Sequence, residues 1–360
     1  MVVDDSVVAR GLTTRWLEEE RDFEVVASCR SGREAVAKVV DSRPDVIILD
    51  VEMPDMDGVE ALPLLLSARP HAAILMASSH TTEGAGLTLK CLQLGATDFL
   101  PKPSRQANSV EYRRDLVARV RALGQVAQRR AQLAPAPAVA AVRPAAAAPV
   151  ARSPIRLAPA ASAAPARMSA LAIGSSTGGP QALHEVLKAA GPSLGSVPIL
   201  IVQHMPAGFT AALAEHLSTG CGIRAREAQD GEDILPGRAY VAPGGRHFSI
   251  ARAGGRVVAK LDDGPRVNFC KPSVDPMFRT ASAVYGAGLF AVMLTGMGSD
   301  GASAVPVVAA AGGRVVAQDE ATSVVWGMPG AAVATGACSA VLPLQQIGHC
   351  IARAARGERM

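Results

Sequence analysis

A long run of alanine and proline near the middle of the chain divides it into two parts that must fold separately. Residues 134–166 are almost wholly alanine and proline, with a few valine, arginine and serine residues and no amphipathic period. Such a segment cannot bury a core. As a flexible coil it would span roughly 30 Å, so the flanking parts could dock or separate. We therefore predict domains over residues 1–130 and 168–354, joined by a flexible linker over 131–167.

Composition supports two domains and argues against nucleic-acid binding. The chain has 360 residues, of which 49% are hydrophobic, enough to fill two cores. Six arginines lie between residues 128 and 167 with no acidic residue: Arg129, Arg130, Arg143, Arg152, Arg156 and Arg167. Without them the net charge of +4 becomes slightly negative. Aromatic residues make up only 3% and form no stripe with basic ones, and no helix-turn-helix pattern stands at the C-terminus, so a DNA-binding output is disfavoured.

The distribution of cysteine and of apolar residues indicates a cytoplasmic protein. The six cysteines are scattered, without CxxC or Cys/His ligand spacing, which fits a reducing compartment. The N-terminus MVVDDSVVAR is acidic where a signal peptide would be basic, and no apolar run reaches the ~18 residues of a membrane span. We expect no membrane insertion. Without a heptad pattern we also expect a monomer.

The part before the linker alternates short β-rich runs with helical patterns. The runs are 23–27, 46–50, 73–77 and 97–100, and the helical patterns lie near 6–19, 31–42, 58–68, 83–94 and 109–130. With a short first strand before Asp4, this rhythm predicts a five-stranded parallel sheet with crossover helices. Because ligands bind beyond the carboxyl ends of such strands, we expect a polar pocket there. Its members would be Asp4, Asp5, Asp50, Ser78 and Lys102.

Clustered carboxylates repel one another unless a cation neutralises them, so Asp4, Asp5 and Asp50 together suggest a Mg²⁺ site. Taken singly, Asp4 and Asp5 could cap the first helix and Lys102 could be a solvated lysine. Jointly, DDS at 4–6, ILDVEMPDMDG at 48–58, ILMASS at 74–79 and Lys102-Pro103 closely resemble the flavodoxin-like receiver domain of two-component response regulators. Receivers usually have a longer first strand.

The resemblance to receivers assigns roles to these residues. It implies that Asp50 accepts a phosphoryl group from a histidine kinase and that Asp5 holds Mg²⁺, with help from Asp4, Asp50 and the Glu52 carbonyl. It also implies that Ser78 and Lys102 respond to the new phosphate. The chemistry agrees, because a phosphoaspartate adds negative charge and acceptor oxygens that a hydroxyl and an ammonium group can meet.

The part after the linker returns to the same alternation and contains a turn suited to a nucleophile. Strands are expected near 169–174, 197–202, 238–243, 289–294, 313–317 and 338–342, which predicts a second doubly wound, Rossmann-like α/β domain. The segment LAIGSSTGGP at 171–180 reads as a strand, a glycine-rich turn and the start of a helix. A serine at such a turn is lifted out of the backbone next to unpaired N–H groups. Phosphate-binding turns have a similar pattern.

A serine nucleophile needs a base and an orienting acid. His204 ends the apolar strand VPILIV, and Asp300 follows the strand at 289–294 through TGMGSDG, so both would lie at the same sheet edge as Ser176. Either could instead be structural, as a hydrogen-bonded strand-end histidine or a helix N-cap. His247 follows the turn APGG and stays undecided. Surface or packing roles are expected for the remaining histidines, which are His71, His80, His184, His216 and His349.

The order serine, histidine, aspartate differs from that of α/β-hydrolases, so an ordinary esterase of that fold is disfavoured. Six segments over residues 168–350 strongly resemble the chemotaxis protein-glutamate methylesterases, the CheB family. They are IGSSTGGP, QHMPAGFT, DGEDILPGRAYVAPGGRH, DGPRVNFCKPSVDPMF, LTGMGSDG and AQDEATSVVWGMP. The family usually has GASTGG where this chain has GSSTGG, so the nucleophile falls on Ser176 and Ser175 becomes a bystander.

The resemblance implies a phosphorylation-regulated methylesterase. His204 would be the base, Asp300 its orienting acid, Met297 an oxyanion donor through its backbone N–H, and Thr177 a residue near the base. Methyl-accepting chemotaxis receptors would be the substrates, with glutamine deamidation as a further activity, a CheA-type histidine kinase as phosphodonor, and no cofactor for hydrolysis. The receiver would cover the active-site edge until Asp50 is phosphorylated. Two alternatives stay open: a non-enzymatic regulator that binds a nucleotide or protein, and an esterase of small metabolites.

Overall fold

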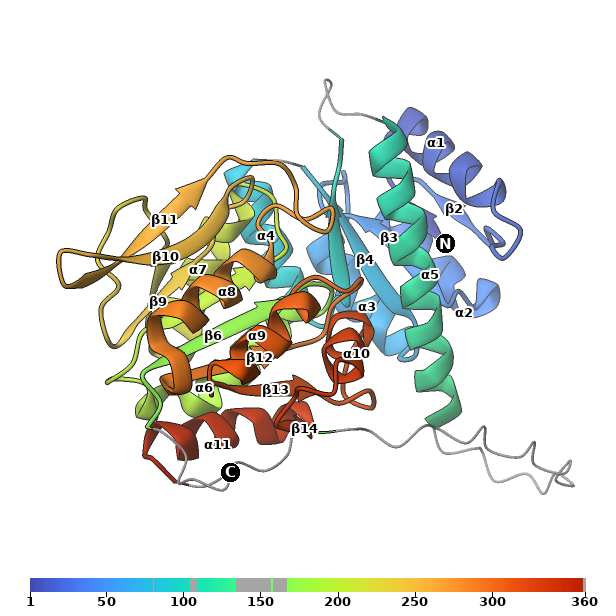
Figure 1. Ribbon diagram of the computed structural model, residues 1–360. Coiled ribbons are helices and arrows are strands. Elements are labelled where there is room, and N and C mark those ends of the chain that lie inside the picture. The colour runs from blue at the N-terminus through green and yellow to red at the C-terminus, as the bar shows by residue number, and fades with distance from the viewer. Residues whose placement is uncertain (80, 104–108, 134–156, 158–166, 359–360) are drawn as a thin grey trace, which may run out of the picture.

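The computed structural model describes residues 1–79, 81–103, 109–133, 157 and 167–358, which form two α/β domains (Figure 1). Apart from its two ends and Leu157, the predicted linker lies outside the described residues. Helix α5, Ser109–Leu133, extends three residues beyond the boundary predicted at 130. The prediction placed residues 131–133 in the linker, but alanine, glutamine and leucine have high helix propensity and continue the helix.

The N-terminal domain is a five-stranded parallel sheet in the order β2-β1-β3-β4-β5, as predicted. Its strands are β1 (Val2–Val3), β2 (Ser28–Cys29), β3 (Val46–Asp50), β4 (Ala73–Ser78) and β5 (Asp98–Pro101). Helices α2 (Gly32–Ser42), α3 (Gly58–Ala68) and α4 (Thr82–Gln93) cover one face, and α1 (Val7–Glu18) and α5 cover the other. Consecutive residues of β3 point to opposite faces, so Ile47 and Ile48 belong to different cores.

The predicted second strand was misplaced. Sequence pattern put it at 23–27, whereas β2 comprises only Ser28–Cys29. The reason lies in its neighbour: β1 has two residues, as the short N-terminus predicted, and they pair in register with Ser28 and Cys29. An edge strand exists only where a partner supplies hydrogen bonds, so β-propensity at 23–27 does not produce a strand.

The C-terminal domain is a seven-stranded parallel sheet in the order β14-β13-β12-β6-β7-β9-β8. Its strands are β6 (Ala170–Ser175), β7 (Ile199–Gln203), β8 (Arg224–Glu227), β9 (Arg238–Val241), β12 (Leu289–Met293), β13 (Arg314–Gln318) and β14 (Ala340–Leu342). Helices α6 (Gly179–Ala190), α7 (Phe209–Cys221) and α11 (Leu344–Ala355) cover one face, and α8 (Val274–Tyr285), α9 (Val305–Ala310) and α10 (Gly327–Ala334) the other. The doubly wound prediction is confirmed, and β6 lies between β7 and β12, where the chain changes direction across the sheet.

Two features of this domain were not predicted from the sequence. They are strand β8 and an antiparallel hairpin of β10 (His247–Ala253) and β11 (Arg256–Asp262), which packs against α8 (Figure 1). All six cysteines are free. None of the helices in the described part of the chain is both long enough and apolar enough to cross a membrane.

The two domains are in contact through α4, which packs against α7 and α6 (Figure 1). The Gln181 amide on α6 donates to the Leu92 carbonyl at 2.9 Å and also to the Ala96 carbonyl. Next to these bonds the rings of Phe99 and Phe209 stack with their centroids 5.0 Å apart. The contact therefore combines an apolar centre with backbone-directed hydrogen bonds.

Candidate active site

Ser176 directly follows β6 and is fixed by its backbone to both neighbouring strands. Its N–H donates to the Thr295 carbonyl beyond β12 at 3.0 Å, and its carbonyl accepts from Nε2 of Gln203 in β7 at 2.9 Å. The chain then enters α6 through Gly178, whose φ of 75° is a left-handed conformation that favours glycine. The turn is thus held rigidly at the carboxyl end of the sheet.

The two adjacent serines differ in their surroundings. Ser175 is fully buried and its hydroxyl donates to Oε1 of Gln203 at 2.7 Å. Ser176 is 7% exposed and lines an open pocket of about 670 Å³. Of the two hydroxyl-bearing residues, only Ser176 is therefore available to a ligand in that pocket.

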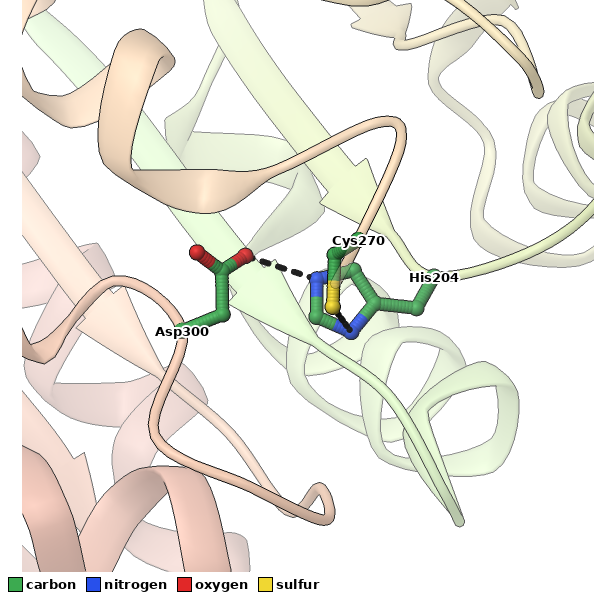
Figure 2. A group of neighbouring side chains, drawn as sticks. All are labelled: His204, Cys270 and Asp300. Atoms are coloured by element: carbon green, nitrogen blue, oxygen red, sulfur yellow. Dashed lines mark hydrogen bonds and ion pairs between the residues drawn. The ribbon is translucent and has the colours of Figure 1, made fainter. Parts of the chain in front are cut away.

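His204 and Asp300 meet at the same sheet edge. His204 follows β7, and its Nε2 lies 2.8 Å from Oδ2 of Asp300 (Figure 2). The other ring nitrogen, Nδ1, lies 3.6 Å from Sγ of Cys270. With Nε2 directed at the carboxylate, Nδ1 is the nitrogen that can exchange a proton with a ligand.

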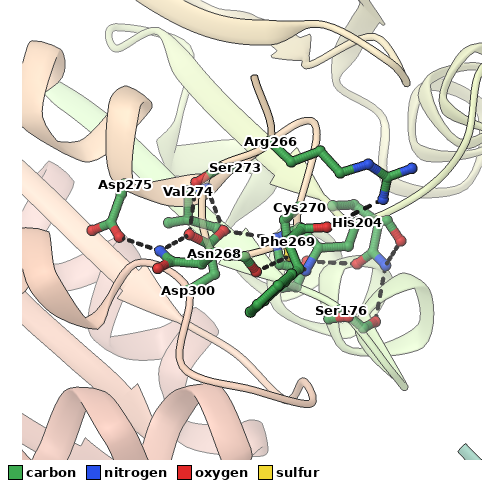
Figure 3. A network of polar contacts seen from close by, with 12 residues as sticks. Ser176, His204, Arg266, Asn268, Phe269, Cys270, Ser273, Val274, Asp275 and Asp300 are labelled. Carbon is green, nitrogen blue, oxygen red and sulfur yellow. Dashed lines mark hydrogen bonds and ion pairs between the residues drawn. The ribbon is translucent and has the colours of Figure 1, made fainter. Parts of the chain in front are cut away.

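The Asp300 carboxylate is enclosed by donors besides the imidazole (Figure 3). Oδ1 accepts from the Ser273 hydroxyl at 2.6 Å and from the Asn268 amide at 2.9 Å, and Oδ2 accepts from the Val274 N–H at 2.6 Å. Asn268 also donates to Asp275. A carboxylate held at both oxygens keeps its orientation, so it fixes the plane and tautomer of His204.

These contacts shift the pKa values of the pair in opposite directions. Burial lowers the pKa of His204, but the hydrogen bonds to Asp300 and Cys270 outweigh it and raise the pKa to about 9. Burial raises the pKa of Asp300, but the bonds from His204, Asn268 and Ser273 outweigh it, so the net direction is down. Asp300 is thus anionic at neutral pH, and it stabilises the protonated imidazole.

The structure brings some predicted site residues together and leaves others apart. Ser176, His204, Met297 and Asp300 line one pocket. Within the described residues, no hydrogen bond joins the Ser176 hydroxyl to His204, because Nδ1 is directed at Cys270 instead. Thr177 is buried outside the pocket lining, and its carbonyl accepts from the Thr295 hydroxyl at 2.9 Å.

The turn before Asp300 approaches the nucleophile turn very closely. A Cβ added at Gly296 would lie 2.8 Å from Cβ of Ser176 and 2.5 Å from Sδ of Met328. Only glycine allows this approach without a shift of neighbouring atoms. The close approach places Met297 beside Ser176 in the pocket lining.

The receiver forms the opposite wall of this pocket. Its contribution comes from β5, Pro103 just after it, and α5: Leu100, Pro101, Pro103, Glu111, Tyr112, Arg114, Asp115, Ala118 and Arg119. Glu111 makes an ion pair with Arg266 at 3.1 Å, and Arg129 donates to the Glu320 carbonyl at 2.9 Å. In this arrangement α5 and Ser176 line the same pocket.

The receiver pocket gathers the predicted acidic residues around Lys102. Carboxylate oxygens of Asp4, Asp5 and Asp50 lie within 4.8 Å of one another. Lys102 Nζ lies 2.5 Å from Asp50 Oδ2 and 2.9 Å from Asp4 Oδ2. Burial raises the pKa of Asp50 to about 6, even though Lys102 opposes the shift. Three clustered carboxylates, of which Asp4 and Asp50 are buried, are a donor set that a divalent cation would stabilise.

The other predicted receiver residues lie beside this cluster. Ser78 is fully buried at the end of β4, where its hydroxyl donates to the Gly84 carbonyl at 3.1 Å and accepts from Thr88 at 2.7 Å. Among the described residues, the Ser78 hydroxyl thus bonds to α4, and no hydrogen bond joins it to Asp50. The Glu52 side chain accepts from the Ser79 hydroxyl at 3.2 Å.

Sequence reasoning missed the residues that support the pair of His204 and Asp300. Asn268, Cys270 and Ser273 belong to the segment NFCKPSVDP, which was noted as a motif without individual roles. Their polar character in a loop just before a helix was the available signal. His247, left undecided, is buried, and its Nε2 contacts the Pro265 carbonyl at 2.9 Å, so it supports the same loop.

Comparison with known proteins agrees with the two-domain architecture. The model of the family described as CheB methylesterase matches residues 171–351, and that of the response regulator receiver domain matches residues 1–112. A protein of Rhodopseudomonas palustris (strain HaA2) named protein-glutamate methylesterase/protein-glutamine glutaminase is 51% identical, covering 100% of this chain and 94% of the relative. This chain belongs to the CheB methylesterase family.

Two further relatives support this assignment to the CheB family. Protein-glutamate methylesterase/protein-glutamine glutaminase 2 of Caulobacter vibrioides (strain ATCC 19089 / CIP 103742 / CB 15) is 48% identical over 99% of this chain and 98% of the relative. The crystal structure of the Thermotoga maritima CheB methylesterase catalytic domain is 38% identical, with a TM-score of 0.50, and covers 52% of this chain and 99% of that one. The C-terminal domain thus has the fold of a CheB catalytic domain.

Proposed function

We propose that this protein hydrolyses γ-glutamyl methyl esters on chemotaxis receptors, deamidates receptor glutamines with the same site, and is controlled by phosphorylation of Asp50. One observation carries the proposal. His204 contacts Asp300, whose two carboxylate oxygens both accept further hydrogen bonds, in the pocket that Ser176 lines. The relatives named protein-glutamate methylesterase/protein-glutamine glutaminase, which match almost the entire chain, support the substrate class.

Hydrolysis would begin with attack of the Ser176 hydroxyl on the ester carbonyl. Nδ1 of neutral His204 accepts the hydroxyl proton, while Asp300 stabilises the imidazolium through Nε2. The tetrahedral intermediate collapses to an acyl-enzyme as methanol leaves with that proton. Water then attacks the acyl-enzyme through the same base, which releases glutamate and regenerates Ser176. Before attack, Nδ1 must exchange its contact with Cys270 for one with Ser176.

The negative charge on the carbonyl oxygen needs donors in the pocket. The Met297 N–H is our proposed donor, because Gly296 brings this turn against Ser176. Removal of one such donor typically lowers kcat by about 10²- to 10³-fold. For glutamine the same acyl-enzyme forms, and His204 would deliver its proton to the departing ammonia. This metal-free chemistry uses only side chains and backbone of the catalytic domain.

The receiver would act as a cover that phosphorylation removes. Mg²⁺ would be held by Asp5 and Asp50, with Asp4 and the Glu52 carbonyl nearby, and would neutralise charge during transfer from a CheA-type histidine kinase. A phosphoryl group on Asp50 competes for Lys102, which now bonds to Asp50 and Asp4. A movement of Lys102 and Ser78 would then weaken the β5 and α5 wall of the pocket.

Methanol release from methylated receptor membranes tests this function. Wild type should release methanol faster when a small phosphodonor is present, Ser176→Ala should release none, and Asp50→Ala should hydrolyse at the basal rate without responding to phosphodonor. Ser175→Ala, whose hydroxyl faces Gln203, is the matched control and should have a mild effect. Release that persists in Ser176→Ala but stops in Ser175→Ala would contradict the assignment.

A further inference from the structure

The loop between β11 and α8 forms a rigid rim of the active-site pocket. Val267 and Cys270 exchange two backbone hydrogen bonds across a tight turn, at 3.1 and 2.9 Å. Within the turn Asn268 and Phe269 have φ values of 50° and 63°, left-handed conformations that non-glycine residues rarely adopt. The Asn268 amide bonds to Asp300, so the strained turn is fixed directly to the orienting acid (Figure 3).

The strained turn displays an apolar ring beside a cation. Phe269 is 80% exposed, the most exposed of the large hydrophobic residues in the described chain. The Arg266 guanidinium donates to the Phe269 carbonyl at 3.2 Å, which holds the cation over the turn (Figure 3). Arg266 and Phe269 both line the pocket that holds Ser176. Lys271, also in the lining, adds positive charge at the same rim.

The receiver places a glutamate on this cation. Oε1 of Glu111, at the first turn of α5, lies 3.1 Å from Nη1 of Arg266. One turn further along α5, the Arg114 guanidinium lies 6.0 Å from the centre of the Phe269 ring. The loop between β11 and α8 is therefore in contact with α5, whose Glu111 places a carboxylate against Arg266.

We propose that Arg266, together with Phe269, recognises a carboxylate side chain next to the ester on the substrate, and that Glu111 occupies its position while the receiver is docked. This inference rests on the proposed function, in which the substrate is a glutamate-bearing polypeptide. A guanidinium already fixed to a backbone carbonyl is preorganised for a carboxylate. Glu111 contacts Nη1 of Arg266, the nitrogen that also donates to the Phe269 carbonyl. A substrate carboxylate that took this position would have to displace Glu111, so substrate recognition and covering by the receiver compete.

Two main peptides, with a third that is flanked by lysine, test the recognition step on the full chain with phosphodonor present. Each carries one γ-methyl glutamate, flanked by glutamate in one peptide and by alanine in the other, because the proposed deamidase activity would convert a flanking glutamine to glutamate. Wild type should show a KM about threefold lower for the glutamate peptide, as expected for one exposed ion pair. Arg266→Ala should equalise the two KM values, and Arg266→Glu should instead favour a lysine-flanked peptide. Arg246→Ala removes a nearby arginine that contacts Asp263 outside the pocket, and should keep the threefold ratio.

The Glu111→Gln variant tests covering of the pocket by the receiver separately from recognition of the substrate by Arg266. Without phosphodonor it should raise methanol release about threefold, because the ion pair with Arg266 is lost. With phosphodonor it should keep the wild-type KM ratio, because Glu111 does not touch the substrate. If the ratio of KM for the two peptides persists in both Arg266 variants, or changes in Glu111→Gln, this inference is wrong while the proposed function still stands. Absence of Ser176-dependent methanol from both peptides would overturn the proposed function as well.

Discussion

In the proposed mechanism, the protonation of His204 decides when the site can hydrolyse an ester. Because its pKa is raised to about 9, through Asp300 and Cys270 against the effect of burial, most of the imidazole is protonated at neutral pH. A general base must be neutral. We therefore expect kcat/KM of the phosphorylated enzyme to rise with pH and to level off above about 9. Asp300→Asn should move this midpoint down and lower the plateau, as measured by methanol release across the pH range. A rate that falls as pH rises toward 9 would contradict the role of His204.

The same shift makes a prediction for stability. The folded pKa of His204 exceeds its ordinary value of 6.5, so this group stabilises the fold fully below 6.5 and progressively less as pH rises through about 9. Thermal unfolding of His204→Gln should lack that part of the pH dependence. Asp50→Asn, which changes a group in the other domain, is the comparison variant and should keep it. Identical pH dependence in His204→Gln and wild type would argue against a raised pKa.

Cys270 should make hydrolysis sensitive to thiol reagents. Its Sγ lies 3.6 Å from Nδ1 of His204 and borders the pocket, whereas the other five cysteines are buried. An adduct on this sulfur would block Nδ1 of His204, the nitrogen that faces Ser176 in the proposed mechanism. We expect iodoacetamide to abolish hydrolysis of wild type, with mass spectrometry placing the adduct on Cys270. Cys270→Ala should resist the reagent. Loss of activity at the same speed in Cys270→Ala would locate the sensitive thiol elsewhere.

At the scale of elements, the turn after β12 is positioned by a contact that only glycine permits. Gly296→Ala would force Cβ against Ser176 and Met328. Displacement of the nucleophile should lower kcat by on the order of 10²-fold, and overpacking should lower the free energy of unfolding by about 1–3 kcal/mol. Gly195→Ala, with open space around the new Cβ, should change neither kcat nor the free energy of unfolding by much. Measured kcat and chemical denaturation distinguish the two variants. Full activity of Gly296→Ala would show that the turn can relax.

Sequence pattern predicted the central strands and the edge strands β5 and β14, but it misplaced the edge strand β2 and missed the edge strand β8, for a physical reason. Strands such as 289–293 are buried on both faces and read as unbroken apolar runs. The edge strand β8 has the sequence RARE, and β2 has two residues, so neither shows such a run. Sequence pattern has the same limit in the candidate active site, where it identifies residues next to central strands but not residues in loops. Ser176, His204 and Asp300 follow central strands, whereas Asn268 and Cys270 lie in a loop whose fold depends on tertiary contacts.

At the scale of the whole molecule, the two domains share the active-site pocket. The receiver supplies one wall through β5 and α5, and α4 of the receiver packs against α6, the helix that follows the Ser176 turn. Asp50 lies at the end of β3 in the same sheet as β5 and contacts Lys102, which directly follows β5. A change at Asp50 therefore has a short path through Lys102 to the pocket wall.

Weakening the contact between domains should release basal activity without phosphate. Gln181 donates to the carbonyls of Leu92 and Ala96, and its loss should destabilise the docked state by about 1–2 kcal/mol, so that the open fraction rises roughly tenfold. Gln181→Ala should thus raise methanol release without phosphodonor and leave the fully phosphorylated rate near that of wild type. Gln345→Ala, an exposed glutamine on α11, is the matched control and should change neither rate. Equal basal rates in Gln181→Ala and wild type would mean that docking does not limit access to Ser176, and that phosphorylation acts on the site by another route.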